Sequence, residues 1–208
     1  MAKAKFREVR MPFKPPVARR HIHTRQIKCD GYERKDGLWD IEARMTDIKS
    51  YDFPNLWRKT IHAGEPIHEM LLRITLNNEL VVQGVEAITE NSPFEICPQV
   101  TAQYQLLIGL KIGPGWRRAI KQKLGGVKGC THLTELLGPV ATTAIQTIYS
   151  LLQRRSGRKD FNPTAGKNDK PSMLNSCYTW GEGSEMIRQN YPDFYVKTEN
   201  SSDLNTKE

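Results

Sequence analysis

The feature that most constrains this fold is a change of hydrophobic period close to Pro93. Before that point apolar and polar residues alternate, most regularly over residues 39–46, as they do in a strand with one buried face. After it, apolar residues recur every three or four positions, most regularly over residues 133–152, as they do in a helix with one buried face. The chain is therefore predicted to be α+β: an antiparallel meander of about four strands in the N-terminal half, covered by helices in the C-terminal half.

The strand pattern covers four segments, with turn residues between them. The segments are residues 20–29, 39–46, 67–76 and 80–89. Asp30-Gly31 and Lys35-Asp36-Gly37 are expected to turn the first strand into the second, and Asn77-Asn78 the third into the fourth. Residues 50–65 show no regular period and are predicted to be a long loop or an excursion at the edge of the sheet.

The helical half is expected to begin at Cys97-Pro98, because proline is favoured in the first turn of a helix. The residues of this helix that are expected to face inward are Val100, Tyr104, Leu107 and Ile108. A second helix is predicted to carry Trp116, Ile120 and Leu124. Residues 177–190 are predicted to form one last short helix.

The length of 208 residues suits one domain with its own core. Residues 1–18 are basic and contain three prolines, which favours an extended arm. Residues 19–155 are predicted to form the α+β domain, residues 156–197 a polar loop and short helix packed on it, and residues 198–208 a disordered tail.

The net charge of +8 is concentrated at the N-terminus, where residues 1–26 hold eight Lys/Arg and one acid. Because the remainder is nearly neutral and shows no binding motif, a nucleic-acid partner is not expected, although the arm could pair with a second subunit in a homodimer. No apolar run is long enough for a membrane span and the N-terminus has no secretory pattern. Four irregularly spaced cysteines fit reduced thiols, so a cytoplasmic protein is expected.

The most suggestive stretch is the glycine-rich segment 125–129, which leads into Cys130, Thr131, His132 and Glu135. Thr131 is expected to cap a helix through its hydroxyl. Cys130 and His132 then lie at the positive end of the helix dipole, where a thiolate or another anion is stabilised. Pro139 is expected to kink or divide that helix. A tight turn with a buried cysteine is the plainer alternative.

His68 shares the apolar face of its predicted strand. Most histidines in such positions are hydrogen-bonded core residues, but this one could also point at the covering helices and act as an acid, base or ligand. The catalytic hypothesis groups His68 with Cys130, His132 and Glu135: a histidine moves a proton, Glu135 orients the imidazole, and the helix start holds a substrate carboxylate.

No phosphate-binding loop, dinucleotide motif or serine-hydrolase elbow is present. The expected enzyme therefore works without an organic cofactor on a small molecule, as a lyase or decarboxylase does. The alternative is a metal site, zinc or an iron–sulphur cluster, held by Cys97, Cys130 and His132 with His68 as a further candidate. A binding or accessory protein that uses the basic arm is a third possibility.

Three segments, Arg19–Arg25, Asp36–Glu42 and Gly129–Leu137, resemble the hallmark blocks of a bacterial family known as domain of unknown function 2889. The resemblance extends over residues 19–152 and implies no established activity. Because members of that family often accompany genes for the catabolism of aromatic compounds, the resemblance implies an aromatic or acyl acid as substrate.

The layout also resembles that of the NifU-like iron–sulphur scaffolds, in which a strand meander is followed by helices with cysteines at their starts. Here Cys97 follows the last predicted strand and Cys130 opens the later helix. That pattern has a third cysteine, which this sequence lacks between Cys97 and Cys130, so His132, His68 or Glu135 would have to replace it.

Overall fold

The computed structural model describes residues 17–155, 170–171 and 173–197. Four long strands form one antiparallel sheet in the order β1-β2-β5-β6, and two short strands form a separate hairpin. The strands are β1 (His23–Glu33), β2 (Trp39–Lys49), β3 (Phe53–Asn55), β4 (Lys59–Ile61), β5 (Pro66–Leu76) and β6 (Val82–Asn91).

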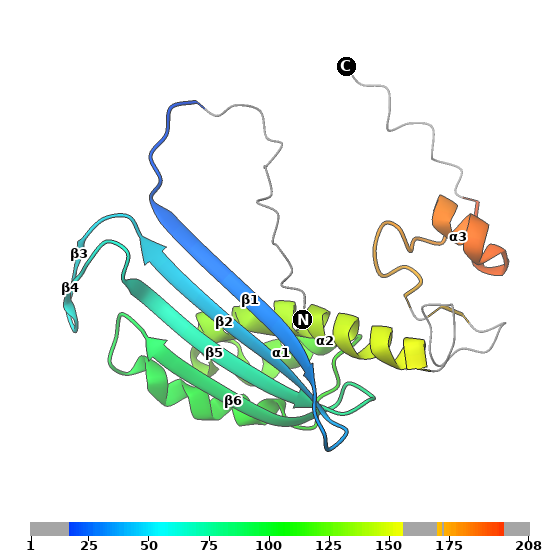
Figure 1. The fold of residues 1–208 in the computed structure, drawn as a ribbon, viewed down its shortest axis with the longest axis horizontal. Coiled ribbons are helices and arrows are strands. Elements are labelled where there is room, and N and C mark those ends of the chain that lie inside the picture. Colours follow the sequence, from blue (N-terminus) through cyan, green and yellow to red (C-terminus); the bar gives the residue numbers. More distant parts are fainter. Residues whose placement is uncertain (1–16, 156–169, 172, 198–208) are drawn as a thin grey trace, which may run out of the picture.

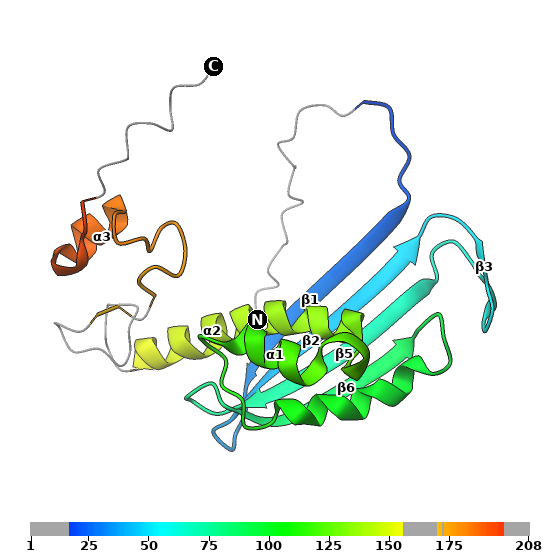
Figure 2. The same ribbon diagram turned by 180° about the vertical axis from the view of Figure 1, so that it is seen from behind.

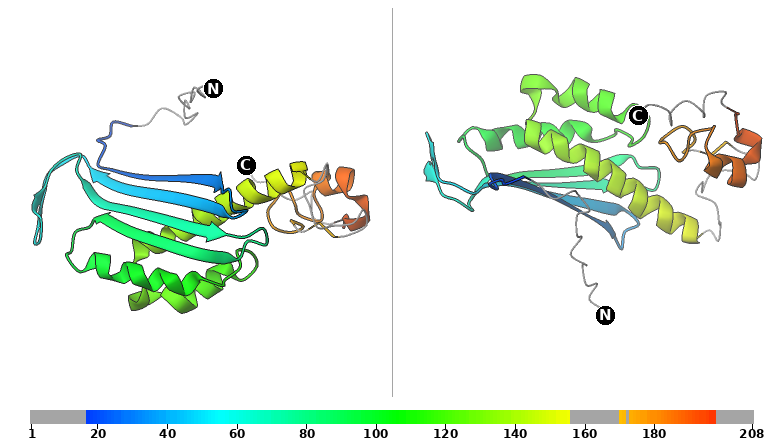
Figure 3. Two further views of the ribbon diagram at one scale, coloured as in Figure 1. Left: turned by 60° about the horizontal axis from the view of Figure 1, so that its bottom comes forward. Right: turned by 90° about the horizontal axis from the view of Figure 1, so that it is seen from above.

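The helical elements follow the sheet in the chain. They are the 3-10 helix η1 (Cys97–Leu107), α1 (Trp116–Leu124), η2 (Gly126–Lys128), α2 (Thr131–Arg155), α3 (Glu185–Asn190) and η3 (Pro192–Phe194). η1, α1 and α2 lie together on one face of the sheet, and the other face carries no helix of the described residues (Figures 1 and 3). The predicted α+β layout is therefore confirmed.

The core lies between the inner face of the sheet and this helical layer, which Figure 2 shows from the helix side. The alternating residues of β2 and β5 contribute one wall, and the helical period of α2 contributes the other. The fully buried side chains of the two walls include Ile41, Met45, Met70, Ile74, Leu133, Leu136, Leu137 and Ile148. The two periods in the sequence thus meet at one interface.

One prediction in the strand region was wrong, and a second segment has more structure than its pattern showed. Asp30-Gly31 does not turn the chain but lies inside β1, where Gly31 pairs with Ile41. Glycine is used there for a different reason: a Cβ on Gly31 would overlap the side chain of Thr147 on α2. The turn that the sequence placed at Gly37 is present, with φ +85° at that residue. Residues 50–65 contain the β3–β4 hairpin, whose three-residue strands are too short to show a period.

The helical region also differs from expectation in detail. Ile108 is 47% exposed because η1 ends at Leu107, whereas Tyr104 and Leu107 are buried as predicted. Thr131 is the first residue of α2 and not its cap; the carbonyl oxygen of Cys130 accepts the Thr134 amide proton instead. Pro139 does not divide α2, which continues to Arg155.

The C-terminal helix α3 is shorter than predicted, and Ser184 caps it by accepting a hydrogen bond from the Ile187 amide. Most of the N-terminal arm, the centre of the predicted polar loop and the tail lie outside the described residues, so the packing of residues 156–197 on the domain stays a prediction. Among the helices of the described residues, none has the length and apolar character to cross a membrane.

Candidate functional site

The centre of the candidate site is Asp47, a carboxylate that is 1% exposed. It lies near the end of β2 on the same inward face as Met45, just before an irregularity in the pairing with β5. The sheet register places Arg25 opposite it on β1 and His68 opposite it on β5. Three neighbouring strands therefore bring a cation, an anion and an imidazole into one row.

Within the described part of the chain, the Asp47 carboxylate makes its polar contacts with nitrogen atoms. The Arg25 guanidinium donates from Nε to Oδ1 and from Nη2 to Oδ2, both at 2.7 Å. His23 Nε2 lies 3.2 Å from Oδ1, and His68 Nδ1 lies 3.1 Å from Oδ2. A buried carboxylate needs such partners because it has left water.

His132 joins this row from the helical layer. Its ring stacks on that of His68, with centroids 3.6 Å apart and an angle of 26° between the planes. Cys130 Sγ lies 3.9 Å from His132 Nδ1. The structure thus brings together His68 and His132, the two histidines that the sequence analysis proposed for the site, and Cys130 lies beside His132.

The start of α2 is held by the buried phenol of Tyr104 on η1. Its oxygen lies 2.9 Å from the Cys130 carbonyl oxygen and 2.9 Å from Thr134 Oγ1, and it accepts the Cys130 amide proton at 3.2 Å. This phenol fixes the backbone immediately before His132. The glycine-rich segment therefore leads into a helix start whose position is set by hydrogen bonds.

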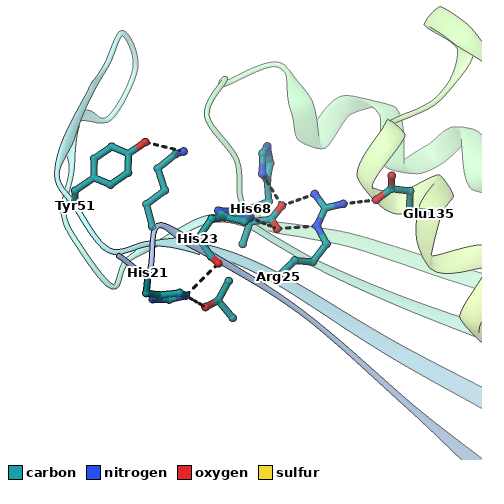
Figure 4. Close-up of polar contacts among 9 residues, drawn as sticks. His21, His23, Arg25, Tyr51, His68 and Glu135 are labelled. Atoms are coloured by element: carbon teal, nitrogen blue, oxygen red, sulfur yellow. Dashed lines mark hydrogen bonds and ion pairs between the residues drawn. The ribbon is translucent and has the colours of Figure 1, made fainter. Parts of the chain in front are cut away.

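Glu135 occupies a different place from the one expected. Its carboxylate accepts a hydrogen bond from Arg25 Nη1, and Figure 4 shows the Arg25 side chain reaching from the strand towards Glu135 on the helix. The carboxylate that orients an imidazole is Asp47, and the imidazole is that of His68. Glu135 thus completes an ion-pair chain from the helix through Arg25 to Asp47.

The charges of this cluster are set by burial and by Arg25. Burial alone would raise the pKa of Asp47, but the Arg25 guanidinium and the His23 hydrogen bond outweigh it and lower that pKa to about 2. Burial, with the nearby His132, lowers the pKa of His68 to about 4. Burial also lowers the pKa of His132. Near neutral pH Asp47 is therefore an ionised carboxylate paired with the Arg25 guanidinium, and His68 and His132 are uncharged imidazoles.

The predicted metal-ligand set is only partly assembled. Among the described residues, the potential ligand atoms of Asp47, His68 and His132 lie within 4.8 Å of one another. Cys97 and Cys130 are not in that group; both line a surface groove between η1 and the start of α2. The set brought together is two histidines and a carboxylate, not the cysteine-rich set expected.

Sequence reasoning missed Asp47, Arg25 and His23. The signal for Asp47 was available, because it continues the inward alternation of residues 39–45 and an acid on an apolar face requires partners. Arg25 and His23 lie in the Arg19–Arg25 block, on a strand whose alternation is impure and whose residues are mostly exposed.

A family model described as "Protein of unknown function (DUF2889)" matches residues 23–146. The chain belongs to the DUF2889 family. The matched region begins at the first residue of β1 and ends within α2, so it includes every residue of the Asp47 cluster. No curated protein and no solved structure matches the chain, and the resemblance to NifU-like scaffolds is not supported.

Proposed function

We propose that this DUF2889 protein is a small-molecule enzyme that moves protons by acid–base chemistry, of the lyase or decarboxylase type, on an aromatic or acyl acid. The observation that carries the proposal is the buried Asp47–His68 pair with His132 stacked against it. Such a carboxylate–imidazole pair defines which ring nitrogen holds the proton, and that is what a general base requires.

The proton inventory follows from the charges. Because Asp47 is ionised, its oxygen accepts, and His68 Nδ1 must carry the hydrogen of this contact. His68 Nε2 then carries a lone pair and can take a proton from a substrate. The imidazolium that forms is stabilised by Asp47, while Arg25 keeps that carboxylate ionised. His132 is the second uncharged imidazole and can return the proton.

The chain contains a matched comparison for this pair. His62 and Asp52 also form a histidine–carboxylate contact, at 2.9 Å, but both side chains are more than half exposed. There the contact with Asp52 raises the pKa of His62, the reverse of His68. An exposed imidazole of that kind remains a solvated surface group, so His62→Gln serves as the control for His68→Gln.

The test is incubation of the full chain in D2O with a panel of aromatic and acyl carboxylic acids, followed by proton NMR. Decarboxylation changes the proton spectrum of the acid into that of its product, and proton abstraction removes the signals of carbon-bound protons as deuterium replaces them. A general base at His68 predicts that His68→Gln lowers turnover by about 100-fold or more and that His62→Gln leaves it unchanged. Equal activity of the two variants would remove His68 from the mechanism.

A second function is favoured by the ligand spacing of Asp47, His68 and His132. Two imidazoles and a carboxylate suit zinc or another first-row divalent metal, and imidazoles that stay unprotonated need not lose a proton to bind it. Against this, Arg25 already occupies both Asp47 oxygens. Titration of the purified chain with Co²⁺, read by visible absorbance, distinguishes the two: a metal centre loses the signal in His132→Ala and keeps it in His62→Gln.

A further inference from the structure

A second feature lies beside the candidate site, on the surface between η1 and the segment from α1 to Cys130. It is a groove of about 620 Å³, within the usual size of small-molecule sites. Its apolar lining includes Ile96, Val100, Leu106 and Val127. Val127 is fully exposed and Ile96 is 67% exposed, so the groove presents apolar surface to solvent.

The charged side chains that line this groove have a single sign. Residues 96–134 contain six Lys/Arg and no Asp or Glu, although the chain beyond residue 26 is nearly neutral as a whole. Two of these cations, Lys123 and Lys128, line the groove, and no carboxylate does. Among the described residues neither lysine forms an ion pair; Lys128 Nζ makes only a 3.4 Å contact with the Gln122 carbonyl. The lysines are available to an anion.

The groove and the candidate site share Cys130. This residue lines the groove, and its Sγ lies 3.9 Å from His132 Nδ1. A molecule in the groove would therefore contact the residue that lies beside His132, although neither histidine lines the groove itself. No aromatic side chain lines the groove, so it lacks the stacking surfaces with which proteins bind single-stranded nucleic acid.

We infer that this groove binds an organic acid with an apolar body, its carboxylate paired with Lys123 and Lys128 and its body on Val127 and its apolar neighbours. The inference rests on the proposed function, because it says where the acid substrate of that enzyme would bind, beside the imidazole pair. An acyl chain and an aryl chain share this chemistry. A neutral molecule of the same shape forms no pair with the lysines and binds more weakly.

The experiment is calorimetric titration of the full chain with octanoate, 4-phenylbutyrate and, as the neutral match, 1-octanol. We expect both acids to bind, and octanol to bind at least about tenfold more weakly, the loss of one favourable charged contact. The double variant Lys123→Gln/Lys128→Gln should lose the preference for the acids. Lys121→Gln removes an exposed cation of the same helix that does not line the groove, and it should bind as the unmodified chain does.

Failure of both acids to bind at millimolar concentration, or unchanged binding in the double variant, overturns the inference. So does an oligothymidylate that displaces the acids, which would assign the groove to nucleic acid. Val127→Asp gives a second reading at a fully exposed position that cannot disturb the core: it should weaken the acids by placing a like charge beside them. His68→Gln should bind acids normally, so that failure of catalysis and failure of binding are separated.

Discussion

His68 and His132 stack face to face with their ring centroids 3.6 Å apart, although one belongs to a central strand and the other to the first turn of a helix. Two imidazolium ions at that separation would repel each other. The stack is therefore compatible with at most one proton beyond the neutral pair. This relationship links the stability of the fold to the protonation of its site.

The first prediction concerns acid. The pKa of His68 is lowered to about 4 from an ordinary value of 6.5, so between those values the unfolded chain binds a proton that the folded chain refuses. The contribution of His68 to the free energy of unfolding should be fully present above pH 6.5 and should be lost as the pH falls towards 4. Stability should fall further below pH 4, because Asp47, whose pKa is lowered to about 2, then takes up its proton. The His68 part is on the order of 3 kcal/mol. Urea unfolding at pH 7, 5.5 and 4 measures it.

The control is the exposed pair. His68→Gln should flatten the loss of stability between pH 6.5 and 4. His62→Gln should not, because a histidine whose pKa is raised by Asp52 gives stability that is present at low pH and disappears as pH rises. Identical pH profiles for the two variants would show that His68 titrates normally.

The second prediction separates the two ends of the ion-pair chain. Arg25→Gln leaves the buried Asp47 carboxylate without its cation, so the pKa of Asp47 should rise and unfolding should need about 2–4 kcal/mol less free energy. Glu135→Gln removes the other end, where the Glu135 side chain is 49% exposed, and should cost less than about 1 kcal/mol. Chemical denaturation at pH 7 compares them; a larger loss for Glu135→Gln would reverse the assignment of Asp47 as the centre.

The layout of the fold could be predicted because period two and period three-to-four are strong local patterns. The same alternation predicted that His68 points inward. Its contact with His132 could be predicted because the helices were expected to cover that face of the sheet. Asp47 could not be recognised in this way. Its role depends on which residues lie opposite it on β1 and β5, and register is a property of strand pairing that no single strand carries.

The positions of the cysteines could not be predicted for a related reason. Cys97 and Cys130 both begin helical elements, which suggested a shared ligand set, but the phase of a 3-10 helix differs from that of an α-helix. In the structure the two cysteines line a common groove, and the potential ligand atoms that lie together among the described residues are those of Asp47, His68 and His132. Gly31 shows the same limit. Its packing partner Thr147 is far away in the sequence, so the sequence around Gly31 suggested a turn and not a tight packing contact.

That contact supplies the third prediction. Gly31→Ala places a methyl group into the side chain of Thr147 and should destabilise the fold by about 1–3 kcal/mol through overpacking between β1 and α2. Adding Thr147→Ala removes part of the obstruction and should recover some of the loss. A double-mutant cycle from urea unfolding gives the coupling, and simple additivity of the two changes would contradict close packing at this point.

The last prediction tests how the start of α2 is positioned. Tyr104 is fully buried, and its hydroxyl contacts the backbone of Cys130 on one side and the Thr134 side chain on the other. Tyr104→Phe keeps the ring but leaves these groups without their partner, which should cost about 1–2 kcal/mol. If the hydroxyl also fixes the helix start, alkylation of Cys130 by iodoacetamide in the folded protein should quicken, since the loosened segment exposes the thiol more often. Cys97→Ser, Cys29→Ser and Cys177→Ser in the background confine the reaction to Cys130. A loss of stability with unchanged alkylation would show that the hydroxyl supports the core without positioning the site.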